Sequence, residues 1–393
     1  MNSEESREIG RRGDGAGIRA VARRARVSPA TVSRVMNGNS SVDKGLAKRV
    51  RDAIRELSYL PNPQARALGS GRSRVLGLLI SEITNPFFPE LFQFFESLAE
   101  KHDYEVVLGS VIHSDEHAQR VTRRMIQRRV EGVAVMTFRA ECDYLSELIS
   151  SKIPLVTIDL APAGDARSQV VQVDYRHGID QAIQHLALLG HRRIGFISGS
   201  MQHLTNKFRQ EAFFDSLRMI GLSPQDSPLF EGDHTFEAGV AAVHHFLALK
   251  EPVTAILSSN DLMAVGVLKA LDERNLNVPE AVSVIGFDDV HLAEFSHPPL
   301  STIRMPREDL AAAAFEGLMR LTQHSGPSAP EPIPVKTHLV IRQSTGPNRN
   351  AVAAVRAPAV TAPSYLAQAR SPSPPEHVQK HTDKQKEQAQ HDY

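Results

Sequence analysis

The sequence is poor in cysteine and in long apolar runs. Cys142 is the only cysteine in 393 residues, which excludes an internal disulfide and a cysteine-based metal site, and we interpret it as a small buried hydrophobe. No apolar run reaches the length of a membrane-spanning helix, and the polar residues 1–16 contain no signal-peptide core. We therefore expect a cytoplasmic protein without a membrane partner and with a disordered N-terminus at residues 1–16.

Common enzyme signatures are also missing. The chain contains no Gly-x-Ser-x-Gly turn, no P-loop and no His/Glu spacing typical of a metal site. Gly13, Gly15 and Gly17 only approach a dinucleotide-binding loop, and they precede any expected strand. From these absences we predict that the protein is not an enzyme and that it uses no cofactor and no metal.

The net charge of zero conceals an uneven distribution of charge. Residues 17–72 contain 12 Lys and Arg against 3 Asp and Glu, a net charge of +9, so the rest of the chain is net acidic. A basic segment attached to a mildly acidic body is typical of a DNA-binding module joined to another domain, although a solvated basic face would have the same composition.

Residues 27–37 predict a short helix with one apolar and one polar face. Ser28 can cap the first turn, and Pro29 fits the first helical position, where no amide donor is needed. The apolar side chains share one side at helical spacing: Val32, Val35 and Met36. The other side carries short or polar side chains: Ala30, Ser33, Arg34 and Asn37. Another short helix over residues 18–25, with Val21, Ala22 and Ala25 inward, ends just before this one, and the pair has helix-turn-helix spacing.

The polar face of this helix suits a DNA major groove. Its short side chains let the backbone approach closely, and Arg34 can reach a guanine edge with two hydrogen bonds. Four side chains suit phosphate oxygens: Ser28, Thr31, Ser33 and Asn37. The alternative is that these residues are ordinary caps and surface residues of a small helical bundle.

A third helix is expected from its N-cap, Asp43, to Pro61. It would close the bundle with four inward side chains: Leu46, Val50, Ile54 and Leu57. Residues 62–69 can form one further turn of helix, which is too short to fold alone and could order against a partner or DNA.

From Val75 onward, apolar runs alternate with amphipathic segments. Strands are expected at residues 75–80, 104–109, 132–138, 154–159, 170–174, 193–198, 255–259 and 283–287, and helices at residues 90–102, 116–128, 175–189, 208–220, 236–248 and 262–274. This alternation predicts an α/β body with parallel sheets covered on both faces, and the number of strands favours two doubly wound subdomains. Residues 346–393 lose the pattern and are expected to form a disordered tail.

Several motifs in this order resemble the lactose-repressor/galactose-repressor family of bacterial transcription regulators. The motifs lie at residues 27–35 (VSPATVSRV), 59–62 (YLPN), 85–88 (NPFF), 190–195 (GHRRIG), 259–261 (SND) and 285–288 (IGFD). The resemblance implies a helix-turn-helix headpiece at residues 17–60, a hinge helix and linker at 61–74, and an effector-binding and dimerisation body at 75–345. That body would resemble periplasmic sugar-binding proteins, with a small polar effector, a sugar or related metabolite, between its subdomains. The family also implies a homodimer that binds a near-palindromic DNA operator. We expect a repressor, because no stretch of the sequence is typical of a polymerase-contacting surface.

The resemblance also implies roles for individual residues. Arg34 would read a base while Pro29 and Ala30 lie against the groove, Tyr59 and Asn62 would contact phosphates, Ala65 would lie at the dimer contact, and Leu68 would wedge into the minor groove. The implied effector-lining residues are Phe87, Phe88, Asp159, Thr205, Arg209, His234, Asn260 and Asp288. Arg209 and Asp288 can bind hydroxyls or a carboxylate, with the phenylalanines as an apolar floor. A strand-end salt bridge and core aromatics are the alternatives.

The chain departs from the family pattern at a few positions. Gly17 and Ala20 replace the usual Thr and Asp, so the first helix loses a cap and an N-terminal carboxylate, about 1 kcal/mol of local stability. His234 replaces an aromatic that often stacks on the ligand. A transport-type binding protein would share the body, but it would need a signal peptide and no headpiece.

Overall fold

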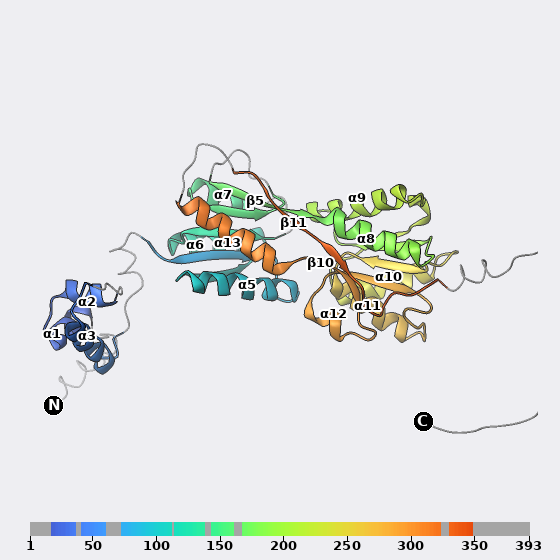
Figure 1. Ribbon diagram of the computed structural model, residues 1–393. Helices are drawn as coiled ribbons and strands as arrows, with labels where there is room; N and C mark the ends of the chain where they lie inside the picture. The colour runs from blue at the N-terminus through green and yellow to red at the C-terminus, as the bar shows by residue number, and fades with distance from the viewer. Residues whose placement is uncertain are drawn as a thin grey trace, which may run out of the picture. The chain divides into compact units, whose positions relative to one another are not determined.

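The computed structural model describes residues 17–36, 41–59, 72–111, 114–137, 143–160, 167–323 and 330–348 (Figure 1). Several predicted features lie outside these residues: the N-terminus at 1–16, the hinge helix, the tail beyond residue 348, and the single residues Asn37, Asn62, Ala65, Leu68 and Cys142. Within the described ranges, no helix is both long and apolar enough to cross a membrane.

The headpiece is a bundle of three helices, α1 (Ile18–Ala25), α2 (Pro29–Met36) and α3 (Lys44–Glu56). Its core is small and aliphatic. The buried side chains are Val21, Ala22, Ala25, Val32, Ala47, Val50 and Ala53. The helix-turn-helix prediction is confirmed, with α1 at the expected bounds and no side-chain cap at Gly17. Asp43 caps α3 as expected, since its carboxylate accepts hydrogen bonds from the amides of Gly45 and Leu46 at 2.9 and 3.0 Å.

The third helix differs from its prediction in two respects. Ala47 and Ala53 are buried, as is Val50, whereas Leu46 is only half-buried. The helix also ends at Glu56, before Pro61. Ser58 adopts a left-handed conformation (φ 46°), and the Tyr59 amide bonds back to the Ile54 carbonyl at 3.0 Å. This Schellman-type turn stops the helix without the usual glycine or proline.

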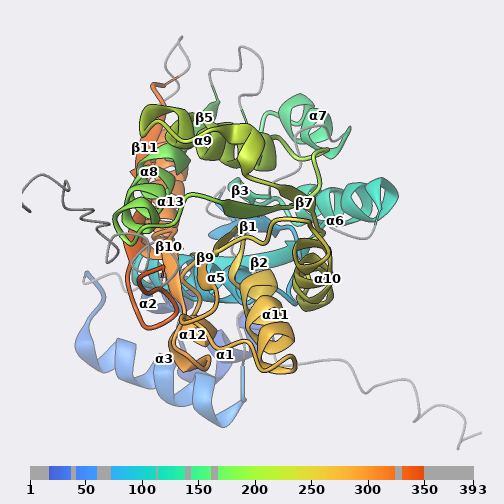
Figure 2. The ribbon, with the colours of Figure 1, turned by 90° about the vertical axis from the view of Figure 1, so that its right-hand side faces the viewer.

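The first sheet of the body is entirely parallel, in the order β11-β5-β4-β3-β1-β2. Its strands are β1 (Val75–Ile80), β2 (Glu105–Ser110), β3 (Gly132–Met136), β4 (Leu155–Ile158), β5 (Ser168–Asp174) and β11 (Ile333–Lys336). Helices α5 (Phe87–Lys101) and α13 (Arg307–Gln323) cover one face, and α6 (Asp115–Gln127) and α7 (Asp143–Ser150) cover the other (Figure 2).

The second sheet has the order β12-β10-β9-β8-β6-β7 and is parallel except for β12, which runs antiparallel to β10. Its strands are β6 (Ile194–Ser198), β7 (Leu229–Glu231), β8 (Ala255–Ser258), β9 (Ser283–Asp288), β10 (Ser301–Arg304) and β12 (His338–Val340). Helices α8 (Tyr175–Leu188) and α9 (Leu204–Met219) cover one face, and α10 (Phe236–Leu247) and α11 (Asp261–Asp272) cover the other. Two short helices complete the subdomain, η2 (Pro224–Asp226) and α12 (His291–Phe295).

The chain crosses between the two sheets three times: from β5 into α8, from β10 into α13, and from β11 to β12 (Figure 1). One hydrophobic cluster includes residues of both subdomains, among them Phe87 of α5 and Phe287 of β9. The prediction of two doubly wound parallel-sheet subdomains is therefore confirmed.

Eight elements of the body were not predicted from the sequence: α7, α12, α13, η2, β7, β10, β11 and β12. The four strands have three or four residues each, and all but β10 lie at a sheet edge. The packed chain also continues past residue 345, where the body was expected to end. Gly346 accepts a hydrogen bond from the buried His191, and the Asn348 amide bonds to the Leu189 carbonyl at 2.8 Å.

Candidate functional site

The second helix of the headpiece presents a polar face to solvent. The Ser28 hydroxyl accepts a hydrogen bond from the Thr31 amide at 3.1 Å, so the helix begins as its cap predicts. Val32 is fully buried against the other two helices, whereas Ala30 and Arg34 are exposed. The packing of Val32 thus fixes the rotation of α2 and directs Arg34 outward.

The described residues of the predicted DNA surface are all accessible to some degree. Ser28, Pro29, Ala30 and Arg34 are exposed, and Thr31, Ser33 and Tyr59 are partly exposed. Tyr59 also packs against the headpiece core, just after the turn that ends α3. The remaining predicted contacts, Asn37, Asn62, Ala65 and Leu68, fall outside the described residues.

In the body, Arg209 is a buried cation held between aromatic rings. Its guanidinium carbon lies 4.2 Å from the ring centroid of Phe287 and 5.0 Å from that of Tyr175. One Nη donates to the Ser259 carbonyl at 2.6 Å. With 3% of its surface exposed, the residue is held by cation–π contacts that gain strength from desolvation. Neither Tyr175 nor Phe287 was predicted as a site residue, although Phe287 immediately precedes Asp288 in a family motif.

Asp288 faces this cation without forming a close ion pair. Its Oδ1 lies 4.0 Å from Arg209 Nη2 and accepts no hydrogen bond from the residues that the structure describes. Burial raises the pKa of Asp288 to about 7, and the charges of Arg209 and Arg307 only partly oppose this shift. A buried carboxyl oxygen without a donor favours a ligand that brings a hydroxyl or amino group to it.

Asp159 contacts the hydroxyl of Tyr175. Its carboxylate accepts hydrogen bonds of 2.7 Å from both the Tyr175 hydroxyl and the Val173 amide. Burial raises the pKa of Asp159, while the two hydrogen bonds oppose that effect. Asp159, Tyr175 and Arg209 therefore form a chain of contacts that links the residue after β4 to α8 and α9.

Phe87 and Phe88, the predicted apolar floor of the effector site, form a buried aromatic pair. Phe87 and Phe88 meet edge to face with their ring centroids 5.3 Å apart, and both are essentially inaccessible. They begin α5 and join the cluster that contains Phe287. In this conformation they pack as core residues.

Asn260 and His234 contact each other in the second subdomain. The Asn260 side chain caps α11, because its Oδ1 accepts a hydrogen bond from the backbone amide of Met263 at 3.0 Å. Its Nδ2 donates a hydrogen bond to the His234 carbonyl at 3.0 Å. His234 has φ 69°, and its ring lies so close to Gly199 that a Cβ there would be 2.2 Å from it. Burial, followed by the charge of Arg209, lowers the pKa of His234 to about 3. The imidazole is therefore neutral near pH 7.

Helix α9 supplies further buried polar groups that were not predicted from the sequence. Thr205 and Arg209 were expected, and both are buried. Asn206 and Gln210 lie at helical spacing around them. Each has a buried side-chain oxygen that accepts no hydrogen bond within the described chain. Their positions could have been inferred from helical spacing. Thr205 and Arg209 form one row along the helix, and Asn206 and Gln210 form the next row.

The second subdomain contacts the start of α5 through a charged network. Arg307 Nη2 lies 3.0 Å from the carboxylate of Glu90, which also accepts the His291 amide at 3.1 Å. Arg307 in addition donates to the carbonyls of Asp288 and Asp289 at 2.7 and 2.8 Å.

None of the described His, Cys, Asp and Glu residues form a group of three or more that could hold a metal ion.

Two family models match the chain. Residues 17–62 match the bacterial regulatory proteins of the lacI family, and residues 183–345 match the periplasmic binding protein-like domain.

Relatives and solved structures agree with these matches. Catabolite control protein A of Priestia megaterium is 34% identical over 303 residues, 76% of this chain and 90% of the relative. The ribose operon repressor of Escherichia coli (strain K12) is 34% identical over 310 residues, 78% of this chain and 93% of the relative. The lac repressor dimer bound to operator and the anti-inducer ONPF has a TM-score of 0.74 at 25% identity, covering 85% of this chain and 100% of that chain. The transcriptional regulator CelR in complex with cellobiose has a TM-score of 0.64 at 27% identity, covering 84% and 99%.

Proposed function

The chain belongs to the lacI family of bacterial regulatory proteins, and from that membership we propose that it is a cytoplasmic repressor that binds a near-palindromic operator as a homodimer. A small polar effector bound between the subdomains of the body would set its affinity for the operator. We also propose that the protein has no catalytic activity.

The observation that carries the DNA-binding role is the orientation of α2. Val32 is locked into the headpiece core and Arg34 projects from the opposite face. A helix that presents one long arginine among short side chains can enter the major groove and form two hydrogen bonds to a guanine. Ser28, Thr31, Ser33 and Tyr59 would bind phosphates around it.

The effector role is supported by buried polar groups at Arg209 and Asp288 and on helix α9. The buried oxygens of Asp288, Asn206 and Gln210 need donors, and Arg209 is itself a donor. A polyhydroxylated ligand such as a sugar supplies both donors and acceptors. The CelR–cellobiose complex provides a sugar-bound example among the similar structures.

Selection of preferred sites from random duplex DNA tests the proposal. The wild-type protein should enrich a near-palindrome, and Arg34→Ala should lose about 1–3 kcal/mol of discrimination at one base pair in each half-site. Arg51→Ala removes an exposed arginine of α3 and is the matched control. A wild-type protein that enriches no sequence, or an Arg34→Ala variant with unchanged preference, would refute the assignment.

The dimer and the hinge belong to the same proposal. Residues 351–393 contain one leucine, Leu366, and five prolines, which do not suit a heptad seam, so the assembly should remain a dimer. Leu68, in the proposed hinge helix, would wedge between base pairs at the operator centre. Leu68→Ala should then reduce DNA bending and relax the sequence preference at the central base-pair step of the operator. It should leave the affinity for the effector unchanged. A tetramer that disappears when the tail is deleted, or normal bending by Leu68→Ala, would contradict these assignments.

A further inference from the structure

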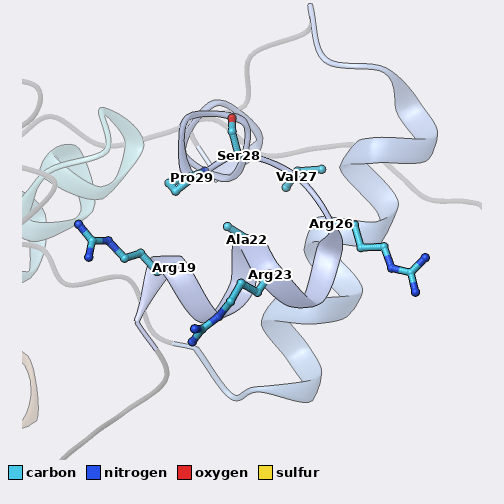
Figure 3. Close-up of a pocket in the computed structure, with 7 residues that line it drawn as sticks. All are labelled: Arg19, Ala22, Arg23, Arg26, Val27, Ser28 and Pro29. Carbon is cyan, nitrogen blue, oxygen red and sulfur yellow. The ribbon is translucent and has the colours of Figure 1, made fainter.

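Three arginines of the first helix and the turn after it share one hollow of the headpiece. Arg19, Arg23 and Arg26 follow each other at helical spacing of four and three residues, and all three reach the surface. With Ala22 and the start of α2, they line a hollow of about 670 Å³. Figure 3 shows the three guanidinium groups spread along α1 and the turn, with Ser28 and Pro29 across the hollow.

These arginines are not neutralised within the headpiece. Its described part contains three acidic residues, Asp43, Asp52 and Glu56. Glu56 pairs with Arg24 at 2.6 Å, Asp52 pairs with Arg55, and Asp43 caps α3. Among the described residues, no carboxylate lies within ion-pair distance of Arg19, Arg23 or Arg26. The hollow therefore has an uncompensated positive charge.

The start of α2 adds to this positive potential. Ser28 and Pro29 form the wall opposite the arginines, and the N-terminal end of a helix carries a partial positive charge. Arg26 also has a left-handed backbone (φ 54°), a conformation that glycine adopts at lower cost. The turn thus carries a cationic side chain where a smaller residue would be less strained.

We infer that this hollow binds phosphates of the DNA backbone beside the major groove read by Arg34. The inference rests on the proposed DNA-binding function and adds a contact surface on the supporting helix. Guanidinium groups bind phosphate oxygens with two parallel hydrogen bonds, and they hold a protein in register without reading sequence. Arg19, Arg23 and Arg26 would supply affinity and its dependence on salt, whereas Arg34 would supply sequence preference.

The salt dependence of binding to a random-sequence duplex tests this inference in the full-length protein. Each bound phosphate releases counterions, so the slope of log affinity against log salt counts the contacts. Arg19→Gln and Arg23→Gln should each reduce the magnitude of that slope by about one, and the triple variant with Arg26→Gly should reduce it by up to about three. The matched control is Arg24→Gln, which removes the same charge from the same helix but from a residue already paired with Glu56. It should leave the slope close to that of the wild type.

The outcomes separate this inference from the proposed function. A wild-type protein that binds no duplex would overturn both. Wild-type binding with an unchanged slope in the triple variant would overturn only the phosphate contact, provided that circular dichroism shows a folded headpiece. A slope lowered equally by Arg24→Gln would also overturn it, since net charge alone would then explain the effect. The single glutamine variants should select the same DNA sequence as the wild type, and a changed preference would contradict a role confined to the backbone.

Discussion

Arg307 donates a hydrogen bond of 2.7 Å to the main-chain carbonyl of Asp288. Asp288 has φ 109°, a conformation that L-residues rarely adopt, and Asp289 after it has φ 56°. A second donor of the same guanidinium holds the Asp289 carbonyl at 2.8 Å, so one side chain stabilises two strained peptides. Since Glu90 of α5 pairs with Arg307, the backbone that positions the Asp288 carboxyl is tied to the first subdomain.

Arg209→Ala and Asp288→Ala should abolish the response to the effector. Among sugars and sugar acids that raise the melting temperature of the wild type, none should stabilise these variants, because each loses a charged or accepting group of the site. Binding to duplex DNA should persist, since the headpiece is unchanged. Arg218→Ala, in the exposed last turn of the same helix, is the control. Normal ligand stabilisation in both site variants would show that the effector binds elsewhere.

The stability of the body should depend on the protonation of Asp288. Burial raises the pKa of this carboxyl to about 7 in the folded chain, whereas an unfolded aspartate titrates near 4. The folded state therefore retains a proton that the unfolded state releases. The resulting contribution to the free energy of unfolding is fully present below about pH 4 and is lost as the pH rises through about 7. The free energy of unfolding falls by at most about 1.4 kcal/mol per pH unit over this range.

Thermal unfolding of Asp288→Asn across pH 5 to about 8 isolates this effect from other groups. The amide resembles the protonated carboxyl and does not titrate, so the stability of the variant relative to the wild type should rise with pH and level off above about pH 7. The pKa of His234 is lowered to about 3, so folding keeps its imidazole neutral and stability decreases as the pH falls. This effect has the opposite sign, but it is the same in the wild type and in Asp288→Asn and cancels in the comparison. Parallel pH profiles would contradict the assignment.

The architecture was largely predictable from the sequence because buried parallel strands leave long apolar runs. β1 was predicted at its observed bounds, and α8 to within one residue. Short strands such as β12 leave no such run, since they are stabilised by pairing with a neighbour that is distant in the chain. The crossover through β11 could not be deduced from local pattern for the same reason. Helix α13, in contrast, has 17 residues rich in Ala and Leu, so its sequence carries a local helical signal that the prediction overlooked.

The sites were predictable to different degrees. The cap at Ser28 and the inward Val32 follow from helical spacing, so the outward position of Arg34 could be derived from the residues themselves. Arg209 and Asp288 were assigned by resemblance only, because they are 79 residues apart in the chain. The hydrogen bonds from Arg307 depend on the left-handed backbone at Asp288 and Asp289, for which the sequence carries no signal.

Arg26→Gly should stabilise the headpiece and weaken its binding to DNA. Arg26 ends α1 in the left-handed conformation, which costs a non-glycine residue roughly 1–2 kcal/mol. Glycine removes this strain, but its greater chain entropy in the unfolded state offsets part of the stabilisation. We expect a net increase of about 0.5–1 kcal/mol in the free energy of unfolding. Chemical denaturation followed by helical circular dichroism measures it. Destabilisation of the headpiece would show that the Arg26 side chain supports the fold.

Glu90→Gln should loosen the link between the effector residues and the first subdomain. The Glu90 carboxylate binds both Arg307 and the His291 amide, and it is about a quarter exposed, so replacing it leaves a largely buried guanidinium with weaker partners. We expect a loss of about 1–3 kcal/mol in stability of the body and a smaller ligand-induced rise in melting temperature.

A pH readout distinguishes this linkage from simple destabilisation. The charge of Glu90 contributes to the raised pKa of Asp288, so Glu90→Gln should shift the Asp288-dependent part of the stability profile to lower pH. Glu96→Gln changes an exposed glutamate on the same helix and should alter neither the stability nor the profile. If Glu90→Gln lowers stability but leaves both the pH profile and the ligand response unchanged, Glu90 is a structural ion-pair partner with no link to the effector site.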